Sequence, residues 1–163
     1  MQIMSMRRTG RRVARLAAGV VLTATAWPAL ALGAPGTQHA ALLRHGRYLV
    51  RHVAMCADCH TAREPGGRLD MSRWLQGAAI GSRPLHPRPW ATRAPDIAGL
   101  PAGWTLAQVV HLLRTGETPD GSHPLPPMPP YRMDARDARA VAYYLSTLQH
   151  GDGDEAAERA PGR

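Results

Sequence analysis

The chain has 163 residues, a length that predicts one domain, and it contains 16 Gly and 15 Pro. All 20 of its basic residues are Arg, and five of them precede residue 16, whereas the first acidic residue is Asp58. Without residues 1–31, 15 Arg face 12 acidic residues, so the formal charge of +8 falls to +3 and no longer argues for nucleic-acid binding. Two cysteines exclude a disulfide-stapled miniprotein and a four-cysteine zinc module.

Residues 1–31 have the features of a secretory signal peptide. An Arg-rich start precedes an apolar run over residues 16–32, and residues 29–31 (Ala-Leu-Ala) fit the small-x-small cleavage pattern. The alternative is an uncleaved anchor that tethers the protein to the membrane, although the run is short for a span and contains Pro28. Because Arg7 and Arg8 lack the apolar residues that follow a twin-arginine signal, we expect export to the periplasm by the general secretory route.

Three helices are predicted in the exported chain. Apolar residues recur with helical spacing in three segments, which are 39–55, 105–115 and 134–148. Thr105 and Asp134 are predicted N-caps, and Gly116 is a predicted helix stop. No convincing alternating strand pattern is present in the sequence. The predicted fold class is therefore all-α.

The predicted domain occupies residues 39–150. Residues 32–38 are expected to form a short linker, and residues 151–163 a disordered tail. Within the domain, residues 61–103 hold six Gly and six Pro, with only a short helical possibility near residues 71–75. Such a long loop fits a compact domain if the chain wraps a large apolar body that is not protein. That body would also complete the core of three short helices without any Phe.

Residues 56–60 (Cys-Ala-Asp-Cys-His) have the spacing C-x-x-C-H, which is the signature of c-type haem attachment. Cys56 and Cys59 can each add to one vinyl group of a porphyrin, and the adjacent His60 can bind its iron. This chemistry consumes both cysteines of an exported chain, so no disulfide is expected. A thioredoxin-like pair would follow a strand, and a zinc site would need a second pair of ligands, so both alternatives fit the sequence less well.

Three segments together resemble the bacterial class I c-type cytochromes that carry one haem. They are residues 46–50 (Gly-Arg-Tyr-Leu-Val), residues 56–60, and residues 126–131 (Pro-Pro-Met-Pro-Pro-Tyr) before a terminal helix. The resemblance covers residues 42–148 or so. It implies a small all-helical cytochrome c fold whose first and last helices cross near Gly46 or Tyr48, with His/Met axial ligation and electron transfer between periplasmic partners. Gly46 and Cys56 are about one residue further apart here than in that pattern.

The sixth iron ligand is predicted to be one of the four methionines of the exported chain, Met55, Met71, Met128 and Met133. Met55 adjoins Cys56 and is too close to reach the opposite face, while Met71 could equally pack in the core. Met128 lies among five prolines in residues 124–130, which predict a stiff, polyproline-like backbone suited to a ligand. The resemblance also places its ligand in a Met-Pro segment before the last helix. We therefore predict Met128, with Met133 as the alternative; Met128 could otherwise be a buried filler under a rigid surface loop.

Other side chains could line the haem or stay in solvent. His123 could compete as a distal ligand, but it is expected to be exposed, as are His52, His86 and His111. Four aromatic residues could form haem-pocket walls or donate to propionates, and these are Trp74, Trp90, Trp104 and Tyr131. Four arginines could pair with the propionates, and these are Arg73, Arg83, Arg88 and Arg93.

Charge is uneven along the exported chain. Residues 32–95 carry nine Arg and three acidic residues, whereas residues 96–163 carry six Arg and nine acidic residues. A basic haem-attachment side that meets an acidic partner is one reading, and scattered solvating arginines are the other. The expected partners are redox proteins, such as a periplasmic dehydrogenase, an oxidase or another cytochrome.

With both axial positions filled, the expected function is electron transfer without substrate chemistry, so the chain is not expected to be an enzyme. Two alternatives remain. One is a dedicated cytochrome subunit of a periplasmic dehydrogenase. The other is a haem enzyme or gas sensor with an open distal site.

Overall fold

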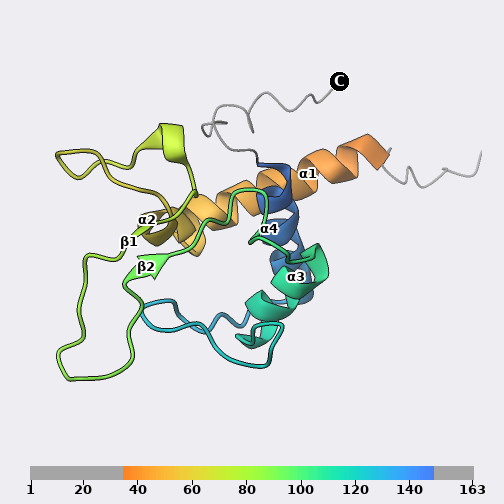
Figure 1. Cartoon of the computed structure of the whole chain (residues 1–163). Helices are drawn as coiled ribbons and strands as arrows, with labels where there is room; N and C mark the ends of the chain where they lie inside the picture. The colour runs from red at the N-terminus through yellow and green to blue at the C-terminus, as the bar shows by residue number, and fades with distance from the viewer. Residues whose placement is uncertain (1–34, 149–163) are drawn as a thin grey trace, which may run out of the picture. The chain divides into compact units, whose positions relative to one another are not determined.

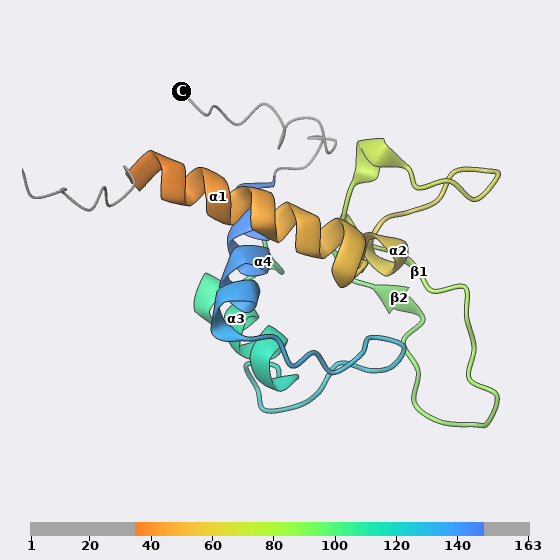
Figure 2. The same ribbon diagram turned by 180° about the vertical axis from the view of Figure 1, so that it is seen from behind.

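Three helices form the framework of the computed structural model, which describes residues 35–148 (Figure 1). They are α1 (Pro35–Tyr48), α3 (Leu106–Thr115) and α4 (Ala135–Thr147). Helix α4 packs against both α1 and α3, and the views from the two sides show α1 crossing α4 (Figure 2). The predicted all-α class with three main helices is confirmed. The predicted signal segment and C-terminal tail lie outside the described residues.

The predicted helix boundaries at α3 and α4 are confirmed by their caps. The Thr105 hydroxyl accepts from the Gln108 N–H at 3.3 Å, and the Gln108 side chain accepts from the Thr105 N–H at 2.8 Å, which is a capping box. Gly116 ends α3 with a left-handed φ of 82°. Asp134 caps α4 by accepting from the N–H groups of residues 136 and 137, both at 2.8 Å.

Helix α1 begins at Pro35, earlier than the predicted residue 39, so residues 35–38 are helical and not a linker. A proline is tolerated here because the first helical turn leaves its N–H groups unpaired. After Tyr48 the chain continues as a π-helix, η1 (Leu49–Val53), in which the Ala54 N–H donates to the Leu49 carbonyl at 2.8 Å. This i→i+5 turn holds one residue more than an α-helical turn. The segment from Gly46 to the cysteine motif is therefore one residue longer than a continuous α-helix of the same number of turns would need.

The crossing of α1 and α4 occurs at Gly46. The backbone of Ala140 occupies the space that a side chain at Gly46 would need. Tyr48, the other residue proposed for the crossing, is 55 % exposed. The core beside this crossing contains large apolar residues from η1, α3, α4 and the loop after η2, among them Leu49, Val50, Leu75, Val109, Leu113, Val141 and Leu145. Trp74 is also buried, and its indole N–H donates to the Tyr144 hydroxyl at 3.1 Å.

The Gly/Pro-rich segment between α2 (Cys56–His60) and α3 contains little regular structure. It includes a short 3₁₀ helix, η2 (Met71–Arg73), at the place where the sequence indicated one. It also includes an antiparallel pair, β1 (Ala78–Ala79) and β2 (Arg93–Ala94), which the sequence did not predict. Two-residue strands are too short to produce an alternating pattern. Within residues 35–148, no helix has the length and hydropathy needed to cross a bilayer.

Candidate haem site

The cysteine motif forms one helical turn, α2 (Cys56–His60). Two residues, 54 and 55, separate it from the end of η1. Cys56 and Cys59 are three residues apart and therefore lie on neighbouring positions of one helix face. Both are free thiols; Cys59 is exposed and Cys56 is half-buried. A helical element, and no strand, leads into the motif, as the sequence predicted.

The chemistry of Cys56 differs from that of a redox-active thiol. Its pKa is raised to about 11, mainly by burial and in smaller part by the neighbouring Cys59. A thioredoxin-like nucleophile instead needs a lowered pKa, because the thiolate is the reactive form. Within the described part of the chain, no cluster of three or more His, Cys, Asp or Glu residues could hold a metal ion. The arrangement of α2 thus agrees with neither of the two alternatives for the cysteine pair.

His60 is buried, with 7 % of its surface exposed, and its ring is fixed by one hydrogen bond. Nδ1 lies 2.8 Å from the carbonyl oxygen of Pro95. Since that carbonyl can only accept, Nδ1 carries the proton and Nε2 keeps its lone pair. Burial lowers the pKa of His60, although the bond to Pro95 opposes this shift. The ring is therefore neutral at pH 7, which is the form of imidazole that binds a metal.

Tyr131 connects the Pro-rich segment to the cysteine motif. Its hydroxyl donates to the carbonyl oxygen of Ala54 at 2.7 Å, across 77 residues of sequence. The pKa of Tyr131 is raised to about 12, mainly by burial and further by the nearby Cys56 and Cys59. Tyr131 thus lies near the thiols, and its role as a haem-pocket wall stays a prediction. It holds residues 126–131 close to the start of α2.

Met128 lines a cavity of about 340 Å³ at the end of α3. The cavity wall is formed by this helix end and the Pro-rich segment, including Leu112, Gly116, His123, Met128 and Tyr131. The peptide bond between Pro126 and Pro127 is cis, and the chain turns at residues 126–128. The predicted continuous polyproline-like form is therefore interrupted directly before Met128.

The other three methionines have different surroundings. Met133 packs against the hydrophobic core, and its N–H donates to the Leu113 carbonyl at 3.0 Å. Met55 precedes Cys56 with a left-handed φ of 49° and is 55 % exposed. Met71 begins η2 and is also exposed. Of the four, Met128 is the one that lines a cavity and does not contribute to the core.

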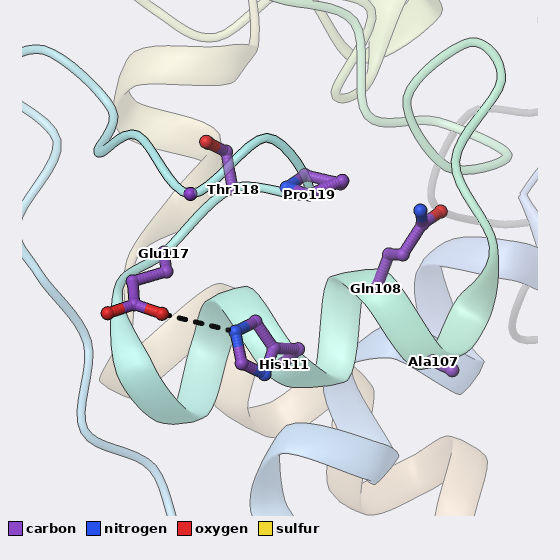
Figure 3. Close-up of a pocket in the computed structure, with 7 residues that line it drawn as sticks. Ala107, Gln108, His111, Glu117, Thr118 and Pro119 are labelled. Atoms are coloured by element: carbon purple, nitrogen blue, oxygen red, sulfur yellow. Dashed lines mark ion pairs between the residues drawn. The ribbon is translucent and has the colours of Figure 1, made fainter.

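His52, His86, His111 and His123 are exposed, as predicted. His123 Nδ1 lies 2.8 Å from the Gly116 carbonyl oxygen, at the C-terminal end of α3. His111 Nε2 lies 3.5 Å from a carboxylate oxygen of Glu117, beside a cavity of about 350 Å³ on the outer face of α3 (Figure 3). That cavity is lined by neither a cysteine nor a methionine, so it is separate from the haem-attachment motif.

Three of the side chains predicted to bind the haem propionates form hydrogen bonds or ion pairs with other residues of the domain. Trp74 uses its indole N–H for Tyr144, and Trp90 donates to the Ser82 carbonyl at 3.0 Å, so neither indole is available to a propionate. Trp104 packs against the core. Arg73 pairs with Asp70, with 2.7 Å between Nε and Oδ2. Arg83, Arg88 and Arg93 are exposed.

The residues around α2 fit a covalently bound haem. Two unbridged thiols and one buried imidazole with an open Nε2 share one helical turn. Gln76 adds an observation that no sequence pattern signalled: its Nε2 is buried and has no hydrogen-bond partner within residues 35–148. Its neighbour Gly77 donates to the His60 carbonyl at 2.7 Å, which places this amide beside the motif. A buried donor without a partner is costly unless a ligand group accepts from it.

Comparison with known proteins points to the same cofactor, although no family model matches the chain. A stretch of 108 residues, 63 % of the chain, is 32 % identical to a diheme cytochrome c-type protein of Cereibacter sphaeroides. A stretch of 77 residues, 45 % of the chain, is 38 % identical to the fructose dehydrogenase cytochrome subunit of Gluconobacter japonicus. The chain is related to the c-type cytochromes.

This relationship gives the described residues a class. They are similar to parts of two c-type cytochromes, and haem c is the group for which their cysteine motif is suited. The chain spans 34 % of the length of the Cereibacter protein and 14 % of that of the Gluconobacter subunit. What those larger proteins do as a whole is therefore a separate question from what this domain does.

Proposed function

We propose that this chain is a periplasmic c-type cytochrome with one haem, which carries single electrons between redox proteins. Cys56 and Cys59 would hold the haem by thioether bonds, and His60 and Met128 would be its axial ligands. The observation that carries the proposal is the geometry of α2, in which two free thiols adjoin a buried imidazole whose Nδ1 bonds to the Pro95 carbonyl. That bond leaves Nε2 for iron and raises its basicity.

The support for Met128 comes from its surroundings. It lines a cavity beside the Pro-rich segment, whereas Met133 is engaged in the core. Tyr131 ties the segment that carries Met128 to Ala54, two residues before the first cysteine. This bond brings the predicted sixth ligand and the thiols into one part of the domain.

The chain would hold its cofactor with little freedom to rearrange. A bound haem supplies a centre that gains and loses one electron. His60 is fixed through Pro95, and the Met128 segment is fixed through Tyr131, so neither side chain needs to move when the charge changes. Small rearrangement is what fast electron transfer requires.

The periplasmic location and the single haem rest on the sequence. Residues 1–31 have the pattern of a secretory signal, and residues 56–60 are the one C-x-x-C-H segment of the chain. A dedicated cytochrome subunit of a periplasmic dehydrogenase is the second candidate, favoured by the similarity to a fructose dehydrogenase cytochrome subunit. Size-exclusion chromatography of the native protein separates the two, because a subunit elutes with its enzyme and a carrier elutes alone.

The decisive experiment is expression in a host that attaches haem, followed by mass spectrometry and a pyridine haemochrome spectrum. We expect a mass increase of one haem and the spectrum of two saturated vinyl groups. Cys59→Ser should shift the band, because one vinyl group then stays conjugated. An exported chain without any added group would refute the proposal.

Carbon monoxide tests the alternative of an open distal site. A reduced haem with both axial positions filled should bind the gas slowly and incompletely. Rapid, complete binding would instead favour a haem enzyme or gas sensor.

A further inference from the structure

A long loop extends from the short sheet of this domain. It comprises residues 80–92, and we call it the hairpin arm because β1 and β2 close its base. Figures 1 and 2 both show it projecting away from the three main helices. The Ile80 N–H donates to the Thr92 carbonyl at 2.9 Å, which extends the pairing by one step. The arm is thus held at its base and exposed along its length.

The hairpin arm is stiff for a loop. It contains three prolines, each of which fixes one backbone torsion angle. The Trp90 indole donates across the arm to the Ser82 carbonyl at 3.0 Å. The Arg88 guanidinium lies over the Trp90 ring, 5.1 Å from its centroid. These contacts lower the conformational entropy that the arm would lose when another molecule binds it.

The positive charge of this region is not neutralised internally. No acidic residue occurs between residues 71 and 95. Arg83, Arg88 and Arg93 are exposed, and none forms an ion pair within residues 35–148. By contrast, the three preceding arginines each have an acidic neighbour, in the pairs Arg63–Asp58, Arg68–Glu64 and Arg73–Asp70. The charge of the hairpin arm, together with that of Arg93 at its base, is therefore available to an external acidic group.

The hairpin arm also presents an apolar side chain. Leu85 is 96 % exposed, more than any other large hydrophobic residue in the described part of the chain. It lies between Arg83 and Arg88, with Pro84 directly before it and Pro87 two residues after it. Apolar residues surrounded by arginines are typical of protein interfaces, where the apolar group is buried and the charges form the rim.

The base of the hairpin arm is bonded to both segments that carry the proposed iron ligands. The Ala91 N–H donates to the Pro126 carbonyl at 2.7 Å, two residues before Met128. Directly after β2, the Pro95 carbonyl accepts from His60 Nδ1 at 2.8 Å. A molecule held by the arm is therefore held at the part of the domain where the electron would enter or leave.

We propose that the hairpin arm docks an acidic redox protein, whose carboxylates pair with Arg83, Arg88 and Arg93 and whose surface covers Leu85. This inference rests on the proposed electron-transfer function. In the docked complex one electron passes between the haem and the redox centre of the partner, so that one is oxidised as the other is reduced and no bond forms or breaks. The stiffness of the arm favours a shaped protein surface over a fluid lipid surface.

The test uses the haem-loaded protein on gold coated with carboxylate-terminated alkanethiols, a defined acidic surface. The arm variant R83Q/R88Q/R93Q is compared with R114Q/R136Q/R139Q, which removes three exposed arginines from α3 and α4 and changes the net charge equally. At low ionic strength we expect the arm variant to lose about tenfold or more of the interfacial electron-transfer rate, and the control about twofold or less. The difference should disappear at high salt.

Equal losses in the two variants would overturn the proposal, because net charge alone would then explain them. Sedimentation with vesicles containing phosphatidylglycerol tests the lipid alternative. Arm-dependent binding to these vesicles, with unchanged rates at the electrode, would also overturn it. If R83Q/R88Q/R93Q does not fold, R83Q/R88Q leaves β2 intact and tests the same point.

A mediated redox titration in solution separates this proposal from the function on which it rests. If the wild type holds no reducible haem, the proposed function fails. If the haem is reduced and reoxidised in every variant but the arm variant behaves as the control does, only the docking proposal fails.

Discussion

Gly46 and Ala140 approach each other so closely that a Cβ at position 46 would overlap the Ala140 carbonyl oxygen and lie 2.7 Å from its carbonyl carbon. The same Cβ would lie 2.8 Å from the Cβ of Tyr144. Two of these contacts are with backbone, which cannot rotate away as a side chain can. The absence of a side chain at one residue of α1 therefore sets how closely α1 and α4 pack.

Gly46→Ala should destabilise the domain by about 3 kcal/mol or more, because the two helices must separate to admit the methyl group. Guanidinium unfolding of the haem-loaded protein measures this. Gly36→Ala is the matched control, since Gly36 lies in the same helix with no atom within 4 Å of the added Cβ. The control should be neutral or gain up to about 1 kcal/mol from helix propensity. Equal stability of the two variants would contradict the close crossing.

The π-helical turn should tolerate the loss of one residue. Deleting His52, which is exposed, should convert residues 49–53 to α-helical pairing and change the free energy of unfolding by no more than about 2 kcal/mol. Haem attachment, measured as haemochrome per chain, should persist. Deleting Arg139 from the regular helix α4 is the control, because it moves the buried Ala138 out of register with Val141. A His52 deletion that abolishes attachment would show that the turn is required.

Tyr131→Phe should lower stability at neutral pH by about 1 kcal/mol, because the Ala54 carbonyl loses its 2.7 Å partner. It should also change the response to alkali. The pKa of Tyr131 is raised from 10.0 to about 12, mainly by burial, so folding favours the protonated phenol. This contribution is complete below pH 10 and is lost as the pH rises through 12.

Unfolding midpoints measured from about pH 9 to about pH 12 test that response, because the phenol of Tyr131 titrates within this range. The wild type should lose more stability over the range than the Phe variant. Equal losses of stability in the wild type and the Phe variant would show that folding does not change the pKa of Tyr131. The thioethers of the haem-loaded protein carry no charge, so burial is the cause that persists there.

The two methionines near the last helix should give opposite results. Met128→Ala should remove the weak sulfur-to-iron band of the ferric spectrum, because the ligand is lost. Met133→Ala should keep that band and lower stability by about 2 kcal/mol, because Met133 packs against the core. Loss of the band in the Met133 variant alone would show that Met133, and not Met128, is the iron ligand.

Several features of the site were predictable from sequence, and others were not. The C-x-x-C-H spacing marks both thiols and the histidine within five residues, and the Pro-rich run draws attention to Met128. Nothing near Pro95 or Ala54 distinguishes them, because each contributes a backbone carbonyl that any residue has. No sequence pattern singles out Gln76 either, because what distinguishes it is a buried amide nitrogen without a hydrogen-bond partner in the described residues. The early start of α1 was missed because Pro35 reads as a helix breaker except in the first turn.

By itself, the sequence determined the three helices, their caps and the cysteine motif. Each of these depends on residues only a few positions apart, because cap hydrogen bonds and helical spacing are local interactions. Three features depend instead on long-range packing: Gly46 is the crossing residue, Pro95 orients His60 across 35 positions, and Tyr131 bonds to Ala54 across 77. Such contacts depend on how whole elements pack against one another, and no local pattern of side chains encodes that geometry.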